Sequence, residues 1–512
     1  MTGNWTDIVF IALPLAYFAS AATAPLLAPA AGWRTVQTGG AAALLLALLL
    51  PWLDSPASGF FAASPMNLTM TVLVSFIGLI VARFSAHYLE GDEGQARFQR
   101  WLQVTLGCVA IVVTSNHFGA LIAAWIGISL SLHQLLMYYP NRKRAVLAAH
   151  KKFIFARIAE LSLIAAAVLL YQTHGSLLLS DILAAYATPA ELSLREQLAA
   201  LLIASAAMVK CAQFPMHGWL IQVVEAPTPV SALLHAGVIN LGGFLLLAFA
   251  PLMLQADLAN WLLLIVAGLT CVAAALITMT RVSIKVLLAW STVAQMGLML
   301  VECALGQYGL ALLHLVAHSC YKAYAFLSSG GEVENYLRKQ MALPAAPGAA
   351  TLPVLFAVAA ATLLTLVYTG YLHSDASLWL LLALFPVIML SERSSQRTQA
   401  SLILTAGLGG LFVIAYAVQK AIFGGLAPVT ALPGFAAALW CAALATLLIG
   451  AYWVLRQRGH SDLGRRLYRN LYAGFYLDEW ATRVTLAVWP ARLPQRAAAR
   501  KNTVFLDQEN LS

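Results

Sequence analysis

Residues 203–243, IASAAMVKCAQFPMHGWLIQVVEAPTPVSALLHAGVINLGG, decide the fold of this chain. Lys210 and His235, two groups that can carry a proton, lie in apolar helical sequence on either side of a stretch rich in helix breakers. A central lysine in a membrane helix costs at least about 2.5–3.5 kcal/mol on insertion scales. A helix interrupted at membrane depth must line a protein interior or a wet cavity. The stretch therefore predicts an ion pathway, with the proton as the first candidate. The breakers are Pro215, Gly218, Pro227 and Pro229.

The composition around this stretch is that of a membrane protein. Of 512 residues, 61% are hydrophobic and 10% are charged, against about 25% charged in soluble chains. The net charge of +9 is no nucleic-acid footprint, because the basic residues fall between apolar segments. The six cysteines form no CxxC pair, so they read as small buried hydrophobes rather than metal ligands. No signal-peptide cleavage site precedes the first apolar segment, which we expect to be a retained span.

Segments long enough to cross a bilayer recur along the whole chain. We expect an all-α, polytopic membrane protein with about fifteen spans (13–16). A short amphipathic piece at 176–187 is expected at an interface. The predicted spans are 8–28, 38–53, 68–88, 101–115, 117–139, 152–171, 197–216, 229–254, 257–279, 284–304, 306–328, 352–370, 376–391, 401–423 and 432–455.

The distribution of lysine and arginine predicts the orientation. Basic residues cluster in alternate connections, with Arg195 as the exception, so the N-terminus is expected outside and the C-terminal tail in the cytoplasm. The clusters are Arg142, Lys143, Arg144, Lys151 and Lys152; Arg281 and Lys285; Arg338 and Lys339; Arg393 and Arg397; and Arg456, Arg458, Arg465 and Arg466.

Span six carries Arg157 and Glu160, which lie three residues apart and therefore on one helix face. They form either a self-neutralising structural pair or part of a switch. In the second case Glu160 faces Lys210 and makes the lysine easier to keep charged, and moving the acid away releases the proton.

Span eleven, ALLHLVAHSCYKAYAFL, places His314, His318 and Lys322 four residues apart along one stripe of an apolar helix. Three ionisable groups in this pattern predict a proton relay. A zinc site on the two histidines is the weaker alternative, because no HExxH acid lies between them. Lys285, at the start of span ten, is either an ordinary loop lysine or a link between the Lys210 and His318 regions. His133 stands alone and reads as a core residue.

The tail from residue 457 mixes basic and aromatic residues at helical spacing. It predicts an amphipathic helix on the inner leaflet or a docking helix for a partner subunit.

Three of these stretches resemble a known family. MVKCAQFPMHGWLIQVVEAPTPVSALLHAG, SIKVLLAWSTVAQMG and ALLHLVAHSCYKAYAFLSSG are similar to signatures of the proton-conducting antiporter-like subunits of respiratory complex I and Mrp-type antiporters. The resemblance covers about residues 68–335 and returns at NLYAGFYLDEW. It implies two inverted five-helix repeats with broken helices. It also makes Lys210 the central lysine, His235 a neighbouring relay residue, and His314, His318 and Lys322 the connecting axis.

On this basis the chain divides into five parts. We expect N-terminal helices at 1–100, a first repeat at 101–254, a second and degenerate repeat at 255–391, C-terminal helices at 392–456 and a cytoplasmic amphipathic tail at 457–512.

Departures from the family pattern narrow the prediction. Ile126, in AWIGISL, occupies the place where the family usually has a glutamate after tryptophan, so the partner of Lys210 is either Glu160 or absent. LFAVAAATLLTLVYTGY lacks the second midplane lysine, and the long lateral helix of the largest complex I subunit is missing.

A shortened member of this kind resembles the membrane subunits of bacterial DAB inorganic-carbon accumulation complexes. That resemblance implies an inner-membrane location and a large cytoplasmic zinc-binding partner related to β-carbonic anhydrases. Proton or Na⁺ flow would drive CO2 hydration there, with no catalytic site, cofactor or metal in this chain. The alternatives are an antiporter-like subunit of NADH-quinone oxidoreductase, a membrane hydrogenase or an Mrp complex, and, from another class, a self-contained enzyme. Against the enzyme, the sequence shows no dinucleotide loop, iron–sulfur spacing or zinc triad.

Overall fold

The computed structural model describes residues 3–56, 58–189, 191–332, 334, 337–338, 434–459 and 461–489. Within these residues, ten helical segments are long and apolar enough to cross a membrane. The chain is thus an all-α polytopic membrane protein, as the hydropathy predicts. Three predicted spans, 352–370, 376–391 and 401–423, lie outside the described residues, so the total of fifteen stays a prediction.

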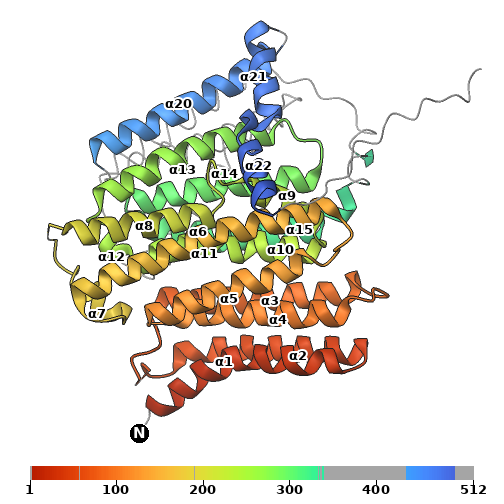
Figure 1. Cartoon of the computed structure of the whole chain (residues 1–512), viewed down its shortest axis with the longest axis vertical. Coiled ribbons are helices and arrows are strands. Elements are labelled where there is room, and N and C mark those ends of the chain that lie inside the picture. Colours follow the sequence, from red (N-terminus) through yellow and green to blue (C-terminus); the bar gives the residue numbers. More distant parts are fainter. Residues whose placement is uncertain are drawn as a thin grey trace, which may run out of the picture.

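The long helices run side by side in successive rows (Figure 1). Helices α1 and α2 lie at one end of the stack and α20 at the other, while α21 and α22 run across the rows. The bounds are α1 (Gly3–Thr23), α2 (Pro29–Leu49), α3 (Pro65–Tyr88), α4 (Gln95–Thr114), α5 (Phe118–Leu136), α6 (Lys143–His174), α7 (Leu179–Ala184), α8 (Leu194–Lys210), α9 (Gly218–Gln222), α10 (Thr228–Ala236), α11 (Leu241–Ala248), α12 (Ala250–Met253), α13 (Asp257–Thr278), α14 (Ile284–Ala304), α15 (Tyr308–Leu327), α20 (Phe435–Gln457), α21 (Asp462–Tyr472) and α22 (Glu479–Val488).

Two predicted boundaries are wrong in an informative way. The second span begins at Pro29 rather than residue 38, because proline suits the first turn of a helix. Gly39 continues that helix where α1 packs closely: a Cβ there would lie 1.8 Å from the Ser20 hydroxyl. The sixth span begins at Lys143 rather than residue 152. Lys151 and Lys152, predicted as loop charges, are therefore buried inside α6.

The bundle has two faces that the hydrogen bonds define. On the basic face, Arg281 of the α13–α14 turn donates to the carbonyls of Leu471 and Tyr472 in the tail. On the far face, His117 pairs with Leu178 and Gln255 donates to the Tyr186 carbonyl. The short interfacial piece predicted at 176–187 contains α7 and lies on the far face.

Candidate ion pathway

The predicted broken helix is present. Helix α8 ends at Lys210, Ala212 has a left-handed φ of 52°, and the five-residue α9 begins only at Gly218. Lys210 thus occupies the C-terminal end of a half-helix, where the helix dipole favours a cation. The proline pair begins the next helix: Pro227 is the N-cap of α10 and Pro229 lies in its first turn, where a missing N–H costs nothing.

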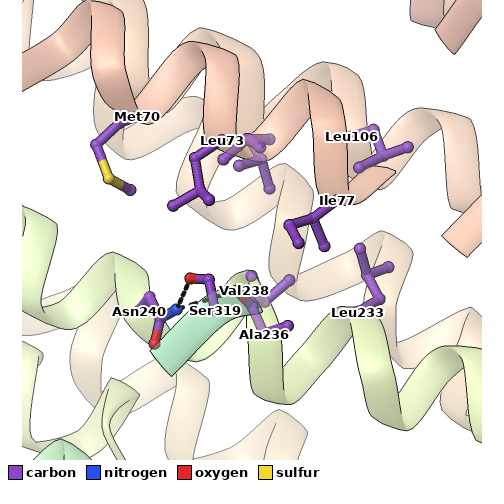
Figure 2. A pocket seen from close by; sticks show the side chains of 12 residues that line it. Met70, Leu73, Ile77, Leu106, Leu233, Ala236, Val238, Asn240 and Ser319 are labelled. Atoms are coloured by element: carbon purple, nitrogen blue, oxygen red, sulfur yellow. Dashed lines mark hydrogen bonds between the residues drawn. The ribbon is translucent and has the colours of Figure 1, made fainter. Parts of the chain in front are cut away.

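Helix α10 is itself interrupted at Gly237, two residues after His235, before the chain continues as the 3-10 turn Val238–Asn240 and α11. Figure 2 shows this break facing α3 and α4 across a small cavity, with the Asn240 amide donating to the Ser319 hydroxyl at 2.7 Å. The cavity measures about 10 Å³, room for roughly one water, and its lining is mostly apolar. This side of the break is therefore a largely closed wall, and the polar groups gather on its other side.

Lys210 is held by an aromatic ring. Its Nζ lies 4.4 Å from the centroid of the buried Trp125 ring on α5, a cation–π contact. Among the described residues no carboxylate lies within 4 Å of this nitrogen. The neighbouring Ile126 packs on the hydrophobic core instead of supplying an acid.

A cluster of charges on α6 meets α5 one turn beyond Trp125. Lys152 Nζ donates to the carbonyl of Ser129 at 2.7 Å and to its hydroxyl at 3.2 Å. Arg157 donates to the same hydroxyl at 3.0 Å and to Glu160 at 2.7 Å, which confirms the predicted pair on one helix face. Glu160 is buried and lies within electrostatic range of both Lys152 and Lys210. Its direct contact is Arg157, so the predicted partnership of Glu160 with Lys210 has no hydrogen bond behind it here and stays a prediction.

A second polar cluster joins α10, α14 and α15. Lys322 is fully buried and donates to the Leu288 carbonyl at 3.0 Å and to the Ser291 hydroxyl at 2.8 Å. Thr292 donates to the same Leu288 carbonyl, and His235 Nδ1 lies 3.0 Å from the Thr292 hydroxyl. Lys322 and His235 are thereby connected through one carbonyl and one hydroxyl.

His318 and His314 continue along α15 toward the far face. Their ring centroids are 6.2 Å apart, as the four-residue spacing predicts. Neither ring nitrogen of the buried His318 has a hydrogen-bond partner among the described residues. His314 contacts Glu302 on α14 with Nδ1, at 3.0 and 3.1 Å, and Gln295 with Nε2, at 2.8 Å.

His314, His318 and Lys322 therefore lie along one stripe of α15, although their role in transport stays a prediction. Within the described residues no group of three histidine, cysteine, aspartate or glutamate side chains could hold a metal ion. In the zinc alternative, one nitrogen of His314 would have to leave its present partner, Glu302 for Nδ1 or Gln295 for Nε2.

Lys285 lies at the basic face and contacts α10. Its Nζ donates to the Thr228 hydroxyl at 2.7 Å, at the first residue of α10. Thr228 in turn contacts the Tyr88 hydroxyl of α3 at 3.3 Å. Lys285 thus links α14 to α10 at the basic end of the second cluster.

The tail docks against the broken helix. Lys151 on α6 is fully buried and donates at 2.8 Å to both carboxylate oxygens of Asp478 and to Thr482. Gln222 of α9 donates to the same carboxylate at 2.9 Å. Burial raises the pKa of Asp478, and the Lys151 ammonium acts in the opposite direction. Gly218 is required here, since a Cβ on it would lie 1.5 Å from an Asp478 oxygen. The described part of the tail packs on the helix bundle of its own chain, and both predicted roles, a surface helix and a docking helix for a partner subunit, stay predictions.

The sequence patterns do not predict three of the functional candidates. Lys151 and Lys152 follow Arg142–Arg144 closely, so the sequence pattern places them among loop charges. Glu302 stands alone near the end of an apolar helix, and only the spacing of seven residues from Gln295, two turns on one face, offered a signal.

Comparison with known proteins settles the family. The family model described as "NADH:quinone oxidoreductase/Mrp antiporter, TM" matches residues 115–391, more than half of the chain, and that of "NADH-Ubiquinone oxidoreductase (complex I), chain 5 N-terminus" matches residues 56–99. The chain belongs to the antiporter-like family. The family predicted from the motifs is thereby confirmed.

Two relatives and one solved structure mark its place in the family. The chain is 49% identical, over 89% of both chains, to the "Probable inorganic carbon transporter subunit DabB" of Hydrogenovibrio crunogenus. It is 30% identical to the "NADH-quinone oxidoreductase subunit L" of Mycobacterium tuberculosis, over 61% of this chain and 50% of that one. A chain of the Mrp complex from Dietzia shares the fold, with a TM-score of 0.65 and 23% identity over 96% of this chain and 61% of the other.

Proposed function

We propose that this chain is the ion-conducting membrane subunit of an inorganic-carbon accumulation complex in the bacterial inner membrane. It passes protons, or Na⁺, through Lys210 and the α6 cluster of Lys152, Arg157 and Glu160, and through the second cluster around His235, Lys322, His318 and His314. This flow drives CO2 hydration on a cytoplasmic zinc-binding partner related to β-carbonic anhydrases. The basic face is the cytoplasmic one. In this proposal the partner binds zinc, and this chain supplies the ion pathway and no catalytic site.

One observation carries the ion-conducting part. Three lysines, Lys152, Lys210 and Lys322, lie inside the helix bundle, and among the described residues no carboxylate lies within 4 Å of any of their nitrogens. Lysine is the cationic side chain whose charge switches readily on burial. Ionisable groups at membrane depth are costly, so such an arrangement favours function over structure.

The similarity to the DabB protein supports inorganic carbon as the substrate. That match extends over 89% of both chains. The alternative is an antiporter-like subunit of NADH-quinone oxidoreductase, a membrane hydrogenase or an Mrp complex. Its specific support is the match to subunit L, which extends over only half of that relative.

The first test is purification of the tagged chain in mild detergent, followed by mass spectrometry of what comes with it. One large zinc-containing soluble protein is the expected companion. Homologous antiporter-like subunits together with iron–sulfur proteins would instead establish the alternative.

The second test addresses conduction. Lys210→Ala removes the ammonium at the end of α8 and should abolish CO2-dependent growth and ion uptake while the amount of protein in the membrane stays unchanged. Glu191→Gln, at an exposed acid outside both clusters, is the control. Wild-type uptake in the Lys210→Ala variant would refute the proposed pathway.

A further inference from the structure

The Glu302 carboxylate is a buried acid at the His314 end of the second cluster. It is 5% exposed, and both of its oxygens lie within 3.1 Å of His314 Nδ1. The motif-based relay ends at His314 and contains no acid. Burying a carboxylate costs free energy unless it is paired, so the burial of Glu302 depends on its contact with His314.

Gln295 fixes which nitrogen of His314 takes part. Its Oε1 lies 2.8 Å from Nε2, and an amide oxygen only accepts hydrogen bonds, so Nε2 carries a proton in this arrangement. Nδ1 is then the nitrogen that gains and loses a proton, and Nδ1 faces Glu302. Gln295 and Glu302 lie seven residues apart on the same face of α14, which lets one imidazole bridge both.

The Glu302–His314 pair lies where the ion pathway would end on the far face. Along α14, Lys285 and Glu302 are seventeen residues apart, which corresponds to about 25 Å at a rise of 1.5 Å per residue. Lys285 lies at the basic face and Glu302 at the far end. Two residues beyond Glu302, Ala304, Leu305 and Gly306 line a cavity of about 240 Å³ that Asp257 and Asn260 also line.

We propose that Glu302 is the proton-holding group at the far-face end of the pathway, with Gln295 as the residue that positions His314. In one state His314 is an imidazolium and Glu302 a carboxylate. Transfer of the Nδ1 proton across the 3.0 Å hydrogen bond leaves a neutral imidazole, protonated on Nε2, and a carboxylic acid. The acid then exchanges its proton with water in the cavity at the α14–α15 turn, and the reverse sequence loads the pathway. No charge is created or lost in the transfer.

This inference rests on the proposed function and names the group at which the proton enters or leaves. The titratable neighbours of Glu302 among the described residues are His314 on α15, Cys271 on α13 and Cys303 on α14. His318 is the next group along α15. A free thiol has a pKa of about 8.5 and is mostly neutral at pH 7, so His314 is the charge partner.

The test compares Glu302→Gln and Glu302→Asp in inverted membrane vesicles that contain the chain with its copurifying subunits, with a pH-sensitive dye as reporter. Glu302→Gln keeps the shape but holds no exchangeable acid proton, and we expect proton uptake to fall at least about tenfold. Glu302→Asp should recover most of the rate with a displaced pH profile, which a structural role would not produce. Glu191→Gln is the matched control.

Uptake by Glu302→Gln within twofold of wild type from pH 6 to 8.5 would overturn the inference. So would equal loss of assembled complex in both variants, since Glu302 would then be structural. Lys210→Ala, measured in parallel, separates the two proposals. If Lys210→Ala is inactive and Glu302→Gln is normal, only the role of Glu302 fails; if Lys210→Ala is active, the pathway itself fails.

Discussion

Replacing Gly218 by alanine should release the tail from the bundle. The added Cβ would lie 1.5 Å from one oxygen of Asp478 and 2.0 Å from its Cγ, so the aspartate cannot stay where it is. If Asp478 moves, the fully buried Lys151 loses its ion-pair partner. Removing one partner of a buried ion pair costs about 3–5 kcal/mol. Because the Asp478 side chain is 29% exposed, we take the lower end. A loss of about 3 kcal/mol raises the undocked fraction roughly hundredfold.

Limited trypsin digestion of the detergent-solubilised complex measures this fraction. When a segment opens and closes faster than it is cut, the cleavage rate follows the open population. Cleavage after Arg469 and Arg483 in the tail should therefore rise by up to two orders of magnitude, while cleavage in the loop at 137–142 serves as an internal reference. Gly450→Ala is the control, since a Cβ at Gly450 in α20 meets nothing within 4 Å.

A double substitution sharpens the test. Asp478→Ala removes the atoms that the new Cβ would strike, and it should itself release the tail. Adding Gly218→Ala to Asp478→Ala should then change the cleavage rate very little, because the two substitutions break the same contact. Wild-type protection in Gly218→Ala, or additive effects in the pair, would refute the docking geometry.

Two further predictions concern the α6 cluster. Glu160→Gln leaves Lys152, Arg157 and Lys210 near one another without the buried carboxylate, so we expect a loss of about 3–5 kcal/mol in stability and a clear fall in ion uptake, measured by thermal unfolding in detergent and by dye quenching; wild-type behaviour at every pH would show that Glu160 is dispensable. Ser129→Ala removes one hydroxyl while Lys152 keeps the Ser129 carbonyl and Arg157 keeps Glu160, so the same measurements should register only about 1 kcal/mol and near-normal uptake; a loss as large as that of Glu160→Gln would contradict this ranking.

The hydropathy and the helix breakers were enough to predict the polytopic helical architecture of the described residues and the break after Lys210, although two helix starts differ by about nine residues. Apolar segments in a bilayer have few alternatives to helix, because each backbone polar group must be satisfied internally. The stripe of His314, His318 and Lys322 was also predictable, because within one helix the spacing determines which side chains share a face.

Contacts between helices were less predictable. The sequence shows that Ile126 replaces an acid, but not that the ring of Trp125, one residue earlier, lies 4.4 Å from Lys210. It places Arg157 beside Glu160, but the Ser129 hydroxyl that joins Lys152 and Arg157 comes from another helix. Such partners depend on the packing of α5, α6 and α8, which local patterns do not encode.

The distribution of basic residues gives a wrong prediction for two lysines that lie close to the start of a helix. Lys151 and Lys152 follow three exposed basic residues, so the positive-inside rule assigned all five to one connection. A lysine is buried only where a partner meets it, and here the partners are Asp478, more than three hundred residues away, and Ser129. The same reasoning applies to Glu302, whose isolation in the sequence hid a contact with His314 that both side chains need. In a membrane bundle, an isolated charge near the end of a span is therefore best examined for a partner on another helix before it is assigned to the interface.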